Sequence, residues 1–394
     1  MKSLINSFLH VVLLALMVPQ VWASPDPNPD PNASVVYLRS SCDIANSNPG
    51  ESPIENCFET MGALQSWIYS RPNLSAKLLI DIGPGTFSSG SSGAGFECRS
   101  TNNTSGGNLT FRGAGTDKTI LSGDAYGVLQ KRCINTNWTF ENLTVSGLYS
   151  AVWYGGGIST WTNVVFLGAW YDRQDDSINP CPVGQQGIHR FFSSRVVAEH
   201  AHGPAFASIC GDNWFWGSEI ISSQNSNPLA PAISAISVSG AGNRLHLYGS
   251  NVRAEALAGD TAPRTMKAMN AMNYAEIHSH GVGIDLIGNT GWTLVGLDAS
   301  SNGEIHANSS SYFVSPKTGV TFRRIANAGG HVHAPYLWEH IPTQRYSSVD
   351  GADMTTVPGT STSDGQPHTV IYSATCASTD GTKPWWDSVD RICR

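Results

Sequence analysis

The stretch Glu276-Ile-His-Ser-His280, followed by Glu304-Ile-His-Ala-Asn308, decides the fold of this chain. Each segment alternates polar and apolar residues, which is the period of a β-strand with one buried side. Five earlier segments share the pattern, and they begin at Asn142, Asn163, Arg195, Glu219 and Asn251. Their unequal but recurrent spacing is typical of stacked repeats, in which each unit buries its apolar side against its neighbours.

The repetition predicts an all-β fold, a single-stranded right-handed parallel β-helix, with a β-sandwich as the alternative. We expect the seven segments to lie in one parallel sheet, each hydrogen-bonded to the next. The composition agrees, because charged residues make up only 13% of the chain and the 40 glycines suit the turns of a solenoid. A single solenoid accounts for the length without a second domain.

The sequence divides into four regions. Residues 1–23 have the features of a secretory signal peptide, since Lys2 precedes an apolar run that is too short for a confident membrane span. Residues 24–34 form a Pro-rich tether, residues 35–328 the β-helix, and residues 329–394 an irregular C-terminal cap. We expect the mature protein to be secreted, periplasmic or extracellular, and to have no membrane contact after cleavage.

All eight cysteines follow the predicted signal peptide, which suggests disulfides in an exported protein. Sequential pairing is expected because each neighbouring pair brackets a loop-rich stretch. The predicted pairs are Cys42–Cys57, Cys98–Cys133, Cys181–Cys210 and Cys376–Cys393, the last of which would pin the cap. No Cys/His spacing indicates zinc and no acidic cluster indicates calcium, so no metal and no cofactor is predicted.

Two N-terminal stretches resemble known proteins. Phe58-Glu-Thr-Met-Gly-Ala-Leu-Gln-Ser-Trp-Ile-Tyr69, with Leu78-Leu-Ile-Asp-Ile-Gly-Pro-Gly-Thr-Phe87, is similar to the first coil of the pectin lyase-like superfamily. Asn108-Leu-Thr-Phe-Arg-Gly-Ala-Gly-Thr-Asp-Lys-Thr-Ile-Leu121 is similar to the second coil of that fold. The resemblance implies a capping helix and then a strand that ends in a Pro-Gly-Thr-aromatic turn. It implies no single activity, because the fold hosts lyases, hydrolases, esterases, epimerases and non-catalytic proteins.

Strand alternation predicts which side chains face solvent in the later coils. Stacking the Asn251, Glu276 and Glu304 segments places polar side chains on one outer face: Arg253, Glu255, Glu276, His278, His280, Glu304 and His306. A water-exposed parallel sheet usually carries Thr, Ser, Asn and Lys instead. Such a patch is either a set of solubilising ion pairs or a polysaccharide groove.

Three functional classes fit this face. The first is a lyase that cleaves a uronate polysaccharide by β-elimination, with Arg253 neutralising the carboxylate and His278 or His280 as the base. The second is a glycoside hydrolase that uses Glu255 and Glu276. The third is a non-catalytic, cell-surface or carbohydrate-binding solenoid. The predicted substrate-contacting residues are His306, Glu304, Trp170, Tyr171 and Trp216, the aromatic ones by stacking on sugars.

The formal charge of −7 argues against nucleic acid as a partner, so a polysaccharide bound by a monomer is expected. A second candidate site lies in the loop 172–202. Asp175-Asp176 and His202-Gly203 are similar to a polygalacturonase pattern, but Ala201 replaces a glycine and no Arg-Ile-Lys follows at a suitable distance. We expect this loop to fold over one edge of the groove.

Overall fold

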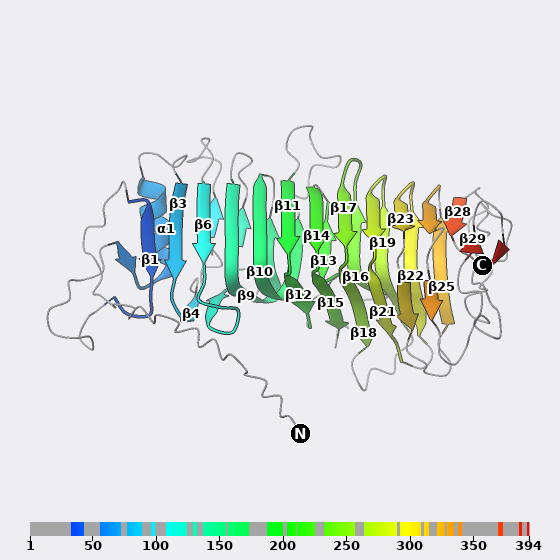
Figure 1. The fold of residues 1–394 in the computed structure, drawn as a ribbon, viewed down its shortest axis with the longest axis horizontal. Helices are drawn as coiled ribbons and strands as arrows, with labels where there is room; N and C mark the ends of the chain where they lie inside the picture. Colours follow the sequence, from blue (N-terminus) through cyan, green and yellow to red (C-terminus); the bar gives the residue numbers. More distant parts are fainter. Residues whose placement is uncertain are drawn as a thin grey trace, which may run out of the picture.

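A computed structural model describes most of the solenoid. The described residues are 33–42, 56–71, 77–88, 96–98, 108–123, 129–131, 137–154, 157–172, 187–199, 203–209, 211–224, 232–256, 264–289, 292–308, 311–314, 321–327, 329–334, 338–340, 369–372, 386–387 and 392–393. They form an elongated coil of parallel strands with one helix at its N-terminal end (Figure 1). The predicted all-β parallel β-helix is therefore confirmed.

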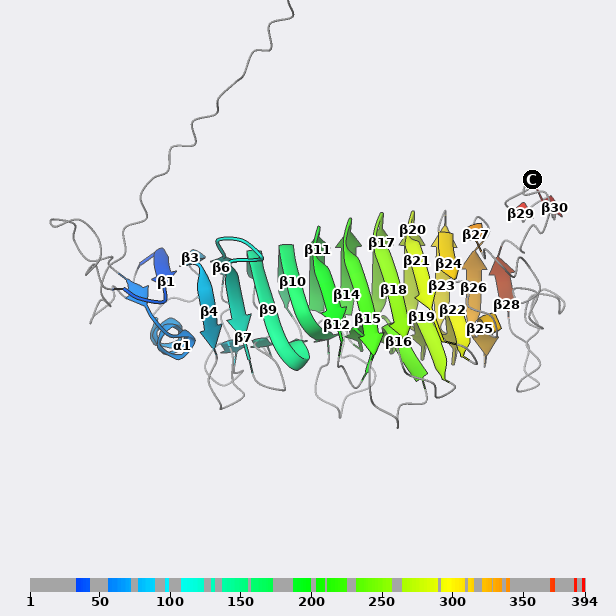
Figure 2. The same cartoon turned by 90° about the horizontal axis from the view of Figure 1, so that it is seen from below.

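The pairing of each strand with the equivalent strand of the next coil gives three faces, and Figure 2 shows these strands side by side along the solenoid. Face 1 contains β1 (Val35–Leu38), β3 (Lys77–Ile82), β6 (Asn108–Arg112), β11 (Gly187–Phe192), β14 (Gly211–Trp216), β17 (Arg244–Tyr248), β20 (Glu276–His280), β23 (Glu304–Asn308), β26 (His331–Ala334) and β28 (Thr369–Tyr372). Face 2 contains β4 (Gly85–Ser88), β7 (Thr119–Ser122), β12 (Arg195–Ala198), β15 (Glu219–Gln224), β18 (Asn251–Ala256), β21 (Gly283–Ile287), β24 (Ser311–Val314) and β27 (Trp338–His340).

Face 3 contains β5 (Phe96–Cys98), β8 (Leu129–Lys131), β13 (Phe206–Ser208), β16 (Ala232–Ser239), β19 (Thr265–Met272), β22 (Thr293–Ser300) and β25 (Thr321–Asn327). Two long strands, β9 (Asn137–Tyr154) and β10 (Ile158–Asp172), bend through all three faces. They join the N-terminal coils to the later ones.

Strand pairing joins all seven segments in one continuous sheet, but the prediction that each is hydrogen-bonded to the next is wrong at one step. Strands β12, β15 and β18 pair in order on face 2, but Asn251 of β18 continues to Gly283 and not to Glu276. Glu276 and Glu304 do lie opposite each other on adjacent parallel strands, on face 1. The chain from Asn251 to Glu276 therefore leads to the next coil on a different face.

The interior is a continuous apolar column closed by small residues at its corners. On face 1 the inward rings of Phe111, Phe140 and Trp161 stack, with centroids 4.7 and 4.0 Å apart. Between faces 1 and 2, Ser193 and Gly217 adopt positive φ, and the buried Ser194 receives a hydrogen bond from the backbone N–H of Val164. Buried polar groups are thus paired along the corner, which keeps the coils in register.

The N-terminal end matches the coils that the family resemblance implies. Helix α1 (Met61–Ser70) follows the short strand β2 (Cys57–Phe58), and Thr60 caps it by accepting a hydrogen bond from the Ala63 N–H. Its buried residues include Trp67, which packs 5.5 Å from Phe58. The Cys42–Cys57 disulfide joins this region to the end of β1 and confirms one predicted pair.

The C-terminal region departs from the predicted boundary. Parallel pairing continues past residue 328, because His331 pairs with Glu304 and Thr369 pairs with His331. A small antiparallel pair, β29 (Trp386–Asp387) and β30 (Ile392–Cys393), lies beyond it. The other three predicted disulfides, the signal peptide and most of the tether lie outside the described residues or side chains. Within the described part, no helix is long and apolar enough to cross a membrane.

Candidate functional site

A cluster of rings and charges covers the outer side of face 1 in four successive coils. We call it the histidine face. It consists of Asp212, Trp214 and Trp216 from β14, Arg244, His246 and Tyr248 from β17, Glu276, His278 and His280 from β20, and Glu304 and His306 from β23. Asp212 is paired in register with Arg244, Arg244 with Glu276, and Glu276 with Glu304. Strand register therefore arranges the side chains of this face in columns.

The rings of the central column stack along the axis of the solenoid. Trp214 lies 3.8 Å from His246, His246 lies 4.9 Å from His278, and His278 lies 4.8 Å from His306, measured between ring centroids. The planes are within 13° of parallel in each case. Because the neighbouring rings cover one another's faces, these side chains present their edges to a ligand. They offer ring nitrogens rather than a stacking surface.

Each imidazole of this column has a carboxylate beside it. The Nε2 of His278 lies 3.2 Å from Oε2 of Glu276, and the Nε2 of His306 lies 3.2 Å from Oε2 of Glu304. His246 Nε2 lies 3.2 Å from Oδ1 of Asp212, an ion-pair distance without the alignment of a hydrogen bond. Carboxylate contacts fix the orientation of an imidazole ring and select which nitrogen carries the proton.

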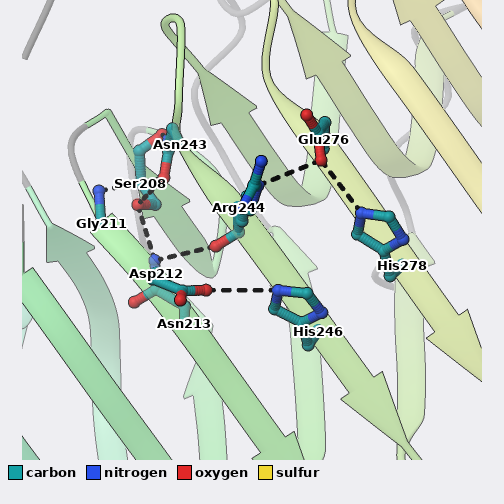
Figure 3. Close-up of polar contacts among 9 residues, drawn as sticks. All are labelled: Ser208, Gly211, Asp212, Asn213, Asn243, Arg244, His246, Glu276 and His278. Atoms are coloured by element: carbon teal, nitrogen blue, oxygen red, sulfur yellow. Dashed lines mark hydrogen bonds and ion pairs between the residues drawn. The ribbon is translucent and has the colours of Figure 1, made fainter.

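Arg244 completes the polar cluster. Its Nε lies 3.1 Å from Oε2 of Glu276, the same oxygen that contacts His278 (Figure 3). The side chain of Arg244 is 51% exposed, so the guanidinium combines one fixed contact with access to solvent. A cation and an imidazole are thus held by a single carboxylate oxygen.

The surroundings of the cluster lower the pKa values of two of its carboxylates and of one imidazole. Burial raises the pKa of Asp212, but His246, Trp214 and Arg244 outweigh it and hold the pKa below its ordinary value. Burial also raises the pKa of Glu276, yet His278 and Arg244 bring it below the ordinary value. The pKa of His278 is lowered by burial first and by the neighbouring imidazoles of His306 and His246, against the opposing effect of Glu276. At neutral pH, Asp212 and Glu276 are therefore charged, and His278, beside Glu276, is neutral.

A buried asparagine positions the start of two of these strands. The side-chain oxygen of Asn243 accepts from the backbone N–H of Gly211 at 3.1 Å and from the hydroxyl of Ser208 at 2.9 Å (Figure 3). Its side-chain nitrogen donates to the backbone oxygens of Ser208 and Ser239, at 2.7 and 3.0 Å. These bonds tie the corner before Asp212 to the corner before Arg244. The buried network thereby fixes the first column of the histidine face.

The residues that strand alternation predicts on one outer face lie on two different faces. Glu276, His278, His280, Glu304 and His306 do share face 1. Arg253 and Glu255 lie on face 2, where the Nη2 of Arg253 contacts Oε2 of Glu255 at 2.8 Å and Asp285 is the residue opposite in β21. The predictions that Arg253 lies beside His278 and that Glu255 pairs with Glu276 are wrong, because these strands belong to different faces.

The predicted aromatic subsites are also corrected. Trp170 has no exposed surface and packs against Phe206 in the core, so it offers nothing to a sugar. Tyr171 is partly buried on the outside of face 3. Trp216 does lie on the histidine face, but Phe192 and Tyr248 stack on either side of it, at 4.6 and 6.0 Å. A sugar meets its edge and cannot stack on its ring.

The residues of this face that the sequence did not single out are Asp212, Arg244 and His246. The sequence does carry their signal, because Arg244-Leu-His-Leu-Tyr248 has the same polar-apolar order as Glu276-Ile-His-Ser-His280. In the second candidate loop, residues 173–186 and 200–202 lie outside the described residues. His189 of that region points into the core and contacts the Ser159 hydroxyl at 2.7 Å.

The rest of the described surface holds a cavity and no metal-binding group. No group of three or more His, Cys, Asp or Glu side chains among them is arranged to hold a metal ion. A cavity of about 420 Å³ lies at the bend between faces 2 and 3, lined by Gly123, Ser146, Gly147, Leu167, Gly168, Val197 and Glu199. It lies away from face 1 and holds no cluster of titratable groups.

Comparisons with known proteins give one distant structural likeness. No protein-family model matches the chain, and no curated protein matches it. Among solved structures, the chain is similar to the A-module of the mannuronan C-5 epimerase AlgE4 from Azotobacter vinelandii. The sequences are 12% identical, the similarity covers 67% of this chain and 90% of that chain, and the TM-score is 0.27. A likeness at this level carries no argument about the site.

Proposed function

We propose that the histidine face binds an acidic polysaccharide and cleaves it by β-elimination. The observation that carries the proposal is the shared oxygen of Glu276, which holds Arg244 at 3.1 Å and His278 at 3.2 Å. β-Elimination of a uronate needs a cation at the sugar carboxylate and a base for the C5 proton, close together. Arg244 and His278 supply these two groups from neighbouring coils.

His278 is suited to accept the proton. The Glu276 carboxylate can only accept a hydrogen bond, so it favours a proton on Nε2 of His278 and leaves Nδ1 as the basic nitrogen. The lowered pKa of His278 keeps the ring neutral near pH 7, as a base requires. A catalytic base works best when its pKa lies near or below the working pH.

Arg244, and not Arg253, is the cation in this proposal, because it lies on face 1 beside His278. Its Nε is held by Glu276, while the half-exposed guanidinium can pair with a sugar carboxylate. Neutralising that carboxylate makes the adjacent C5–H more acidic, since the negative charge that develops on proton removal is stabilised. A polysaccharide partner outside the cell also fits the exported location predicted from residues 1–23.

A glycoside hydrolase is less well supported. Hydrolysis with two carboxylates needs one of them protonated, with a raised pKa, to act as the general acid. Asp212 and Glu276 both have a lowered pKa, so neither keeps a proton near neutral pH.

The test is a screen of the mature chain against uronate-containing and neutral polysaccharides. We expect an ultraviolet-absorbing unsaturated product from a uronate polymer, and a turnover about 10²–10⁴-fold lower in His278→Ala. The matched control is Thr160→Ala, since Thr160 holds the same column on β10 and should leave turnover unchanged. New reducing ends without the absorbing product would indicate a hydrolase, and binding without turnover would indicate a carbohydrate-binding solenoid.

A further inference from the structure

The stereochemistry of a substrate follows from how the rings of the central column are arranged. His246 and His278 project from adjacent strands of one sheet, and their rings are 4.9 Å apart and within 9° of parallel. Both ring edges point outward from the same flat face. A sugar ring that lies on this face therefore meets both imidazoles from one side.

We propose that His246 is the proton donor to the leaving group, so that elimination is syn and the substrate is a glucuronate or mannuronate polymer. The inference rests on the proposed β-elimination. In glucuronate and mannuronate the C5–H bond and the C4–O4 bond lie on the same side of the ring. In galacturonate they lie on opposite sides, and one flat face cannot reach both.

The proton transfers balance within this pair of residues. His278 removes the C5 proton, and the electrons of the C5–H bond form the C4=C5 double bond. The C4–O4 bond breaks with its electrons on O4, and the imidazolium of His246 gives its proton to that oxygen. Afterwards His278 carries one proton more and His246 one fewer, and exchange with solvent water restores both.

His246 differs from the other neighbour of His278 in its surroundings. It lies on the same strand as Arg244, two residues away, and therefore on the side where the sugar carboxylate binds. Its ring is sandwiched between Trp214 at 3.8 Å and His278, and its Nε2 faces Asp212. An indole face and a carboxylate both interact favourably with an imidazolium. His306 has the carboxylate of Glu304 but lies on the coil farther from Arg244.

The first experiment compares uronate polymers on the wild-type protein. Unsaturated product should form from mannuronan or glucuronan at least about tenfold faster than from polygalacturonate. A base and an acid on one face reach the C5 proton and O4 together only when both lie on the same side of the sugar ring. A faster reaction on polygalacturonate would overturn the inference while leaving the β-elimination itself intact. Absence of unsaturated product from all three polymers would instead contradict the proposed function.

The second experiment separates proton donation from structural damage. His246→Gln should lower turnover of the preferred polymer by about 10²–10⁴-fold. The comparison substrate is a synthetic uronate of the same configuration with a nitrophenyl group at O4, and nitrophenolate leaves without a proton. On this substrate, the loss of turnover should be below about tenfold. Equal losses on both substrates would overturn the assignment of His246.

Two variants control for position and for folding. His306→Gln changes an equivalent imidazole one coil farther on, and its effect should be the same on both substrates. If His306→Gln instead shows the dependence on the leaving group, His246 is not the donor. Asp212→Asn keeps the shape of the residue that positions His246. It should lower turnover of the polymer more than turnover of the nitrophenyl substrate, and by less than His246→Gln does. Equal effects of Asp212→Asn on both substrates would count against the assignment.

Discussion

The N-terminal and C-terminal coils of face 1 place their rings on opposite sides of the same sheet. In the first coils the rings stack inside, in the column Phe111, Phe140, Trp161, Phe191 and Phe215, and in later coils Leu247, Ser279 and Ala307 take those positions. Outside, the column runs Thr110, Thr139 and Thr160 and then, after Arg190, Trp214, His246, His278 and His306.

The threonine column shows what this face needs in order to remain a stable, water-exposed sheet. The coils of β6, β9 and β10 stack with threonine in the outer position that the imidazoles later occupy, and they have the same register as the later coils. The histidine face is therefore an addition to the fold and not a requirement of it. This difference favours function over simple surface solubility for the later coils.

The largest expected effect comes from comparing a substitution at an inward residue of β20 with one at its outward neighbour. Ile277 has no exposed surface, whereas its neighbour His278 points outward. Ile277→Asp should abolish folding because it buries an unpaired charge, and His278→Ala should fold normally. Yield of soluble protein and circular dichroism measure both. A well-folded Ile277→Asp protein would show that the inward side is not packed as described.

A smaller effect separates the inner and outer columns in the first coils. Phe140 is fully buried between Phe111 and Trp161, so Phe140→Ala should lower the free energy of unfolding by about 3–5 kcal/mol. The adjacent Thr139→Ala should change it by no more than about 0.5 kcal/mol. Denaturant unfolding of the two variants gives the comparison. Similar losses in both would mean that the outer threonines are themselves a structural column.

The smallest effect is the pH dependence of stability. The pKa of His278 is lower in the folded protein, so the unfolded chain binds the proton more readily as the pH falls below about 6.5. The free energy of unfolding should therefore decrease from about pH 7 to pH 5, and less so in His278→Ala. Below about pH 4, loss of charge on Asp212 and Glu276 should decrease it further, because their pKa values are also lowered. Denaturant titrations across this range give the answer, and a rise in stability on acidification would contradict these shifts.

The sequence predicted the strand period, the N-terminal helix, the Cys42–Cys57 disulfide and the outward position of His278. It did not predict which face each strand joins, because every coil contains several strands with the same alternation. The spacing from Asn251 to Glu276 is close to that of one coil, and it cannot reveal that the chain has crossed a corner. The true predecessor of Glu276 is Arg244, on the preceding coil of face 1.

Trp170 failed as a prediction for a different reason. The pairing of β10 with β9 shifts register between Leu167 and Ala169 and again before Trp170. Despite these shifts, simple alternation places Trp170 inside, because Val164, Phe166 and Trp170 are separated by even numbers of residues and all three are buried. The prediction was wrong because it took a core ring for a sugar contact. The buried Asn243 network could not be predicted, since a lone asparagine in a loop sequence gives no sign of four hydrogen bonds.

The most direct measurement compares turnover of a uronate polymer by Arg244→Ala and Arg253→Ala. Both change a solvent-accessible arginine that contacts a glutamate, at 3.1 Å on face 1 and 2.8 Å on face 2. If the histidine face is the active site, Arg244→Ala should lower kcat/KM by about 10²-fold or more, because it removes the charge that stabilises the reacting carboxylate. Arg253→Ala should retain full activity. Full activity in Arg244→Ala, or a loss confined to Arg253→Ala, would contradict the placement of the active site on face 1.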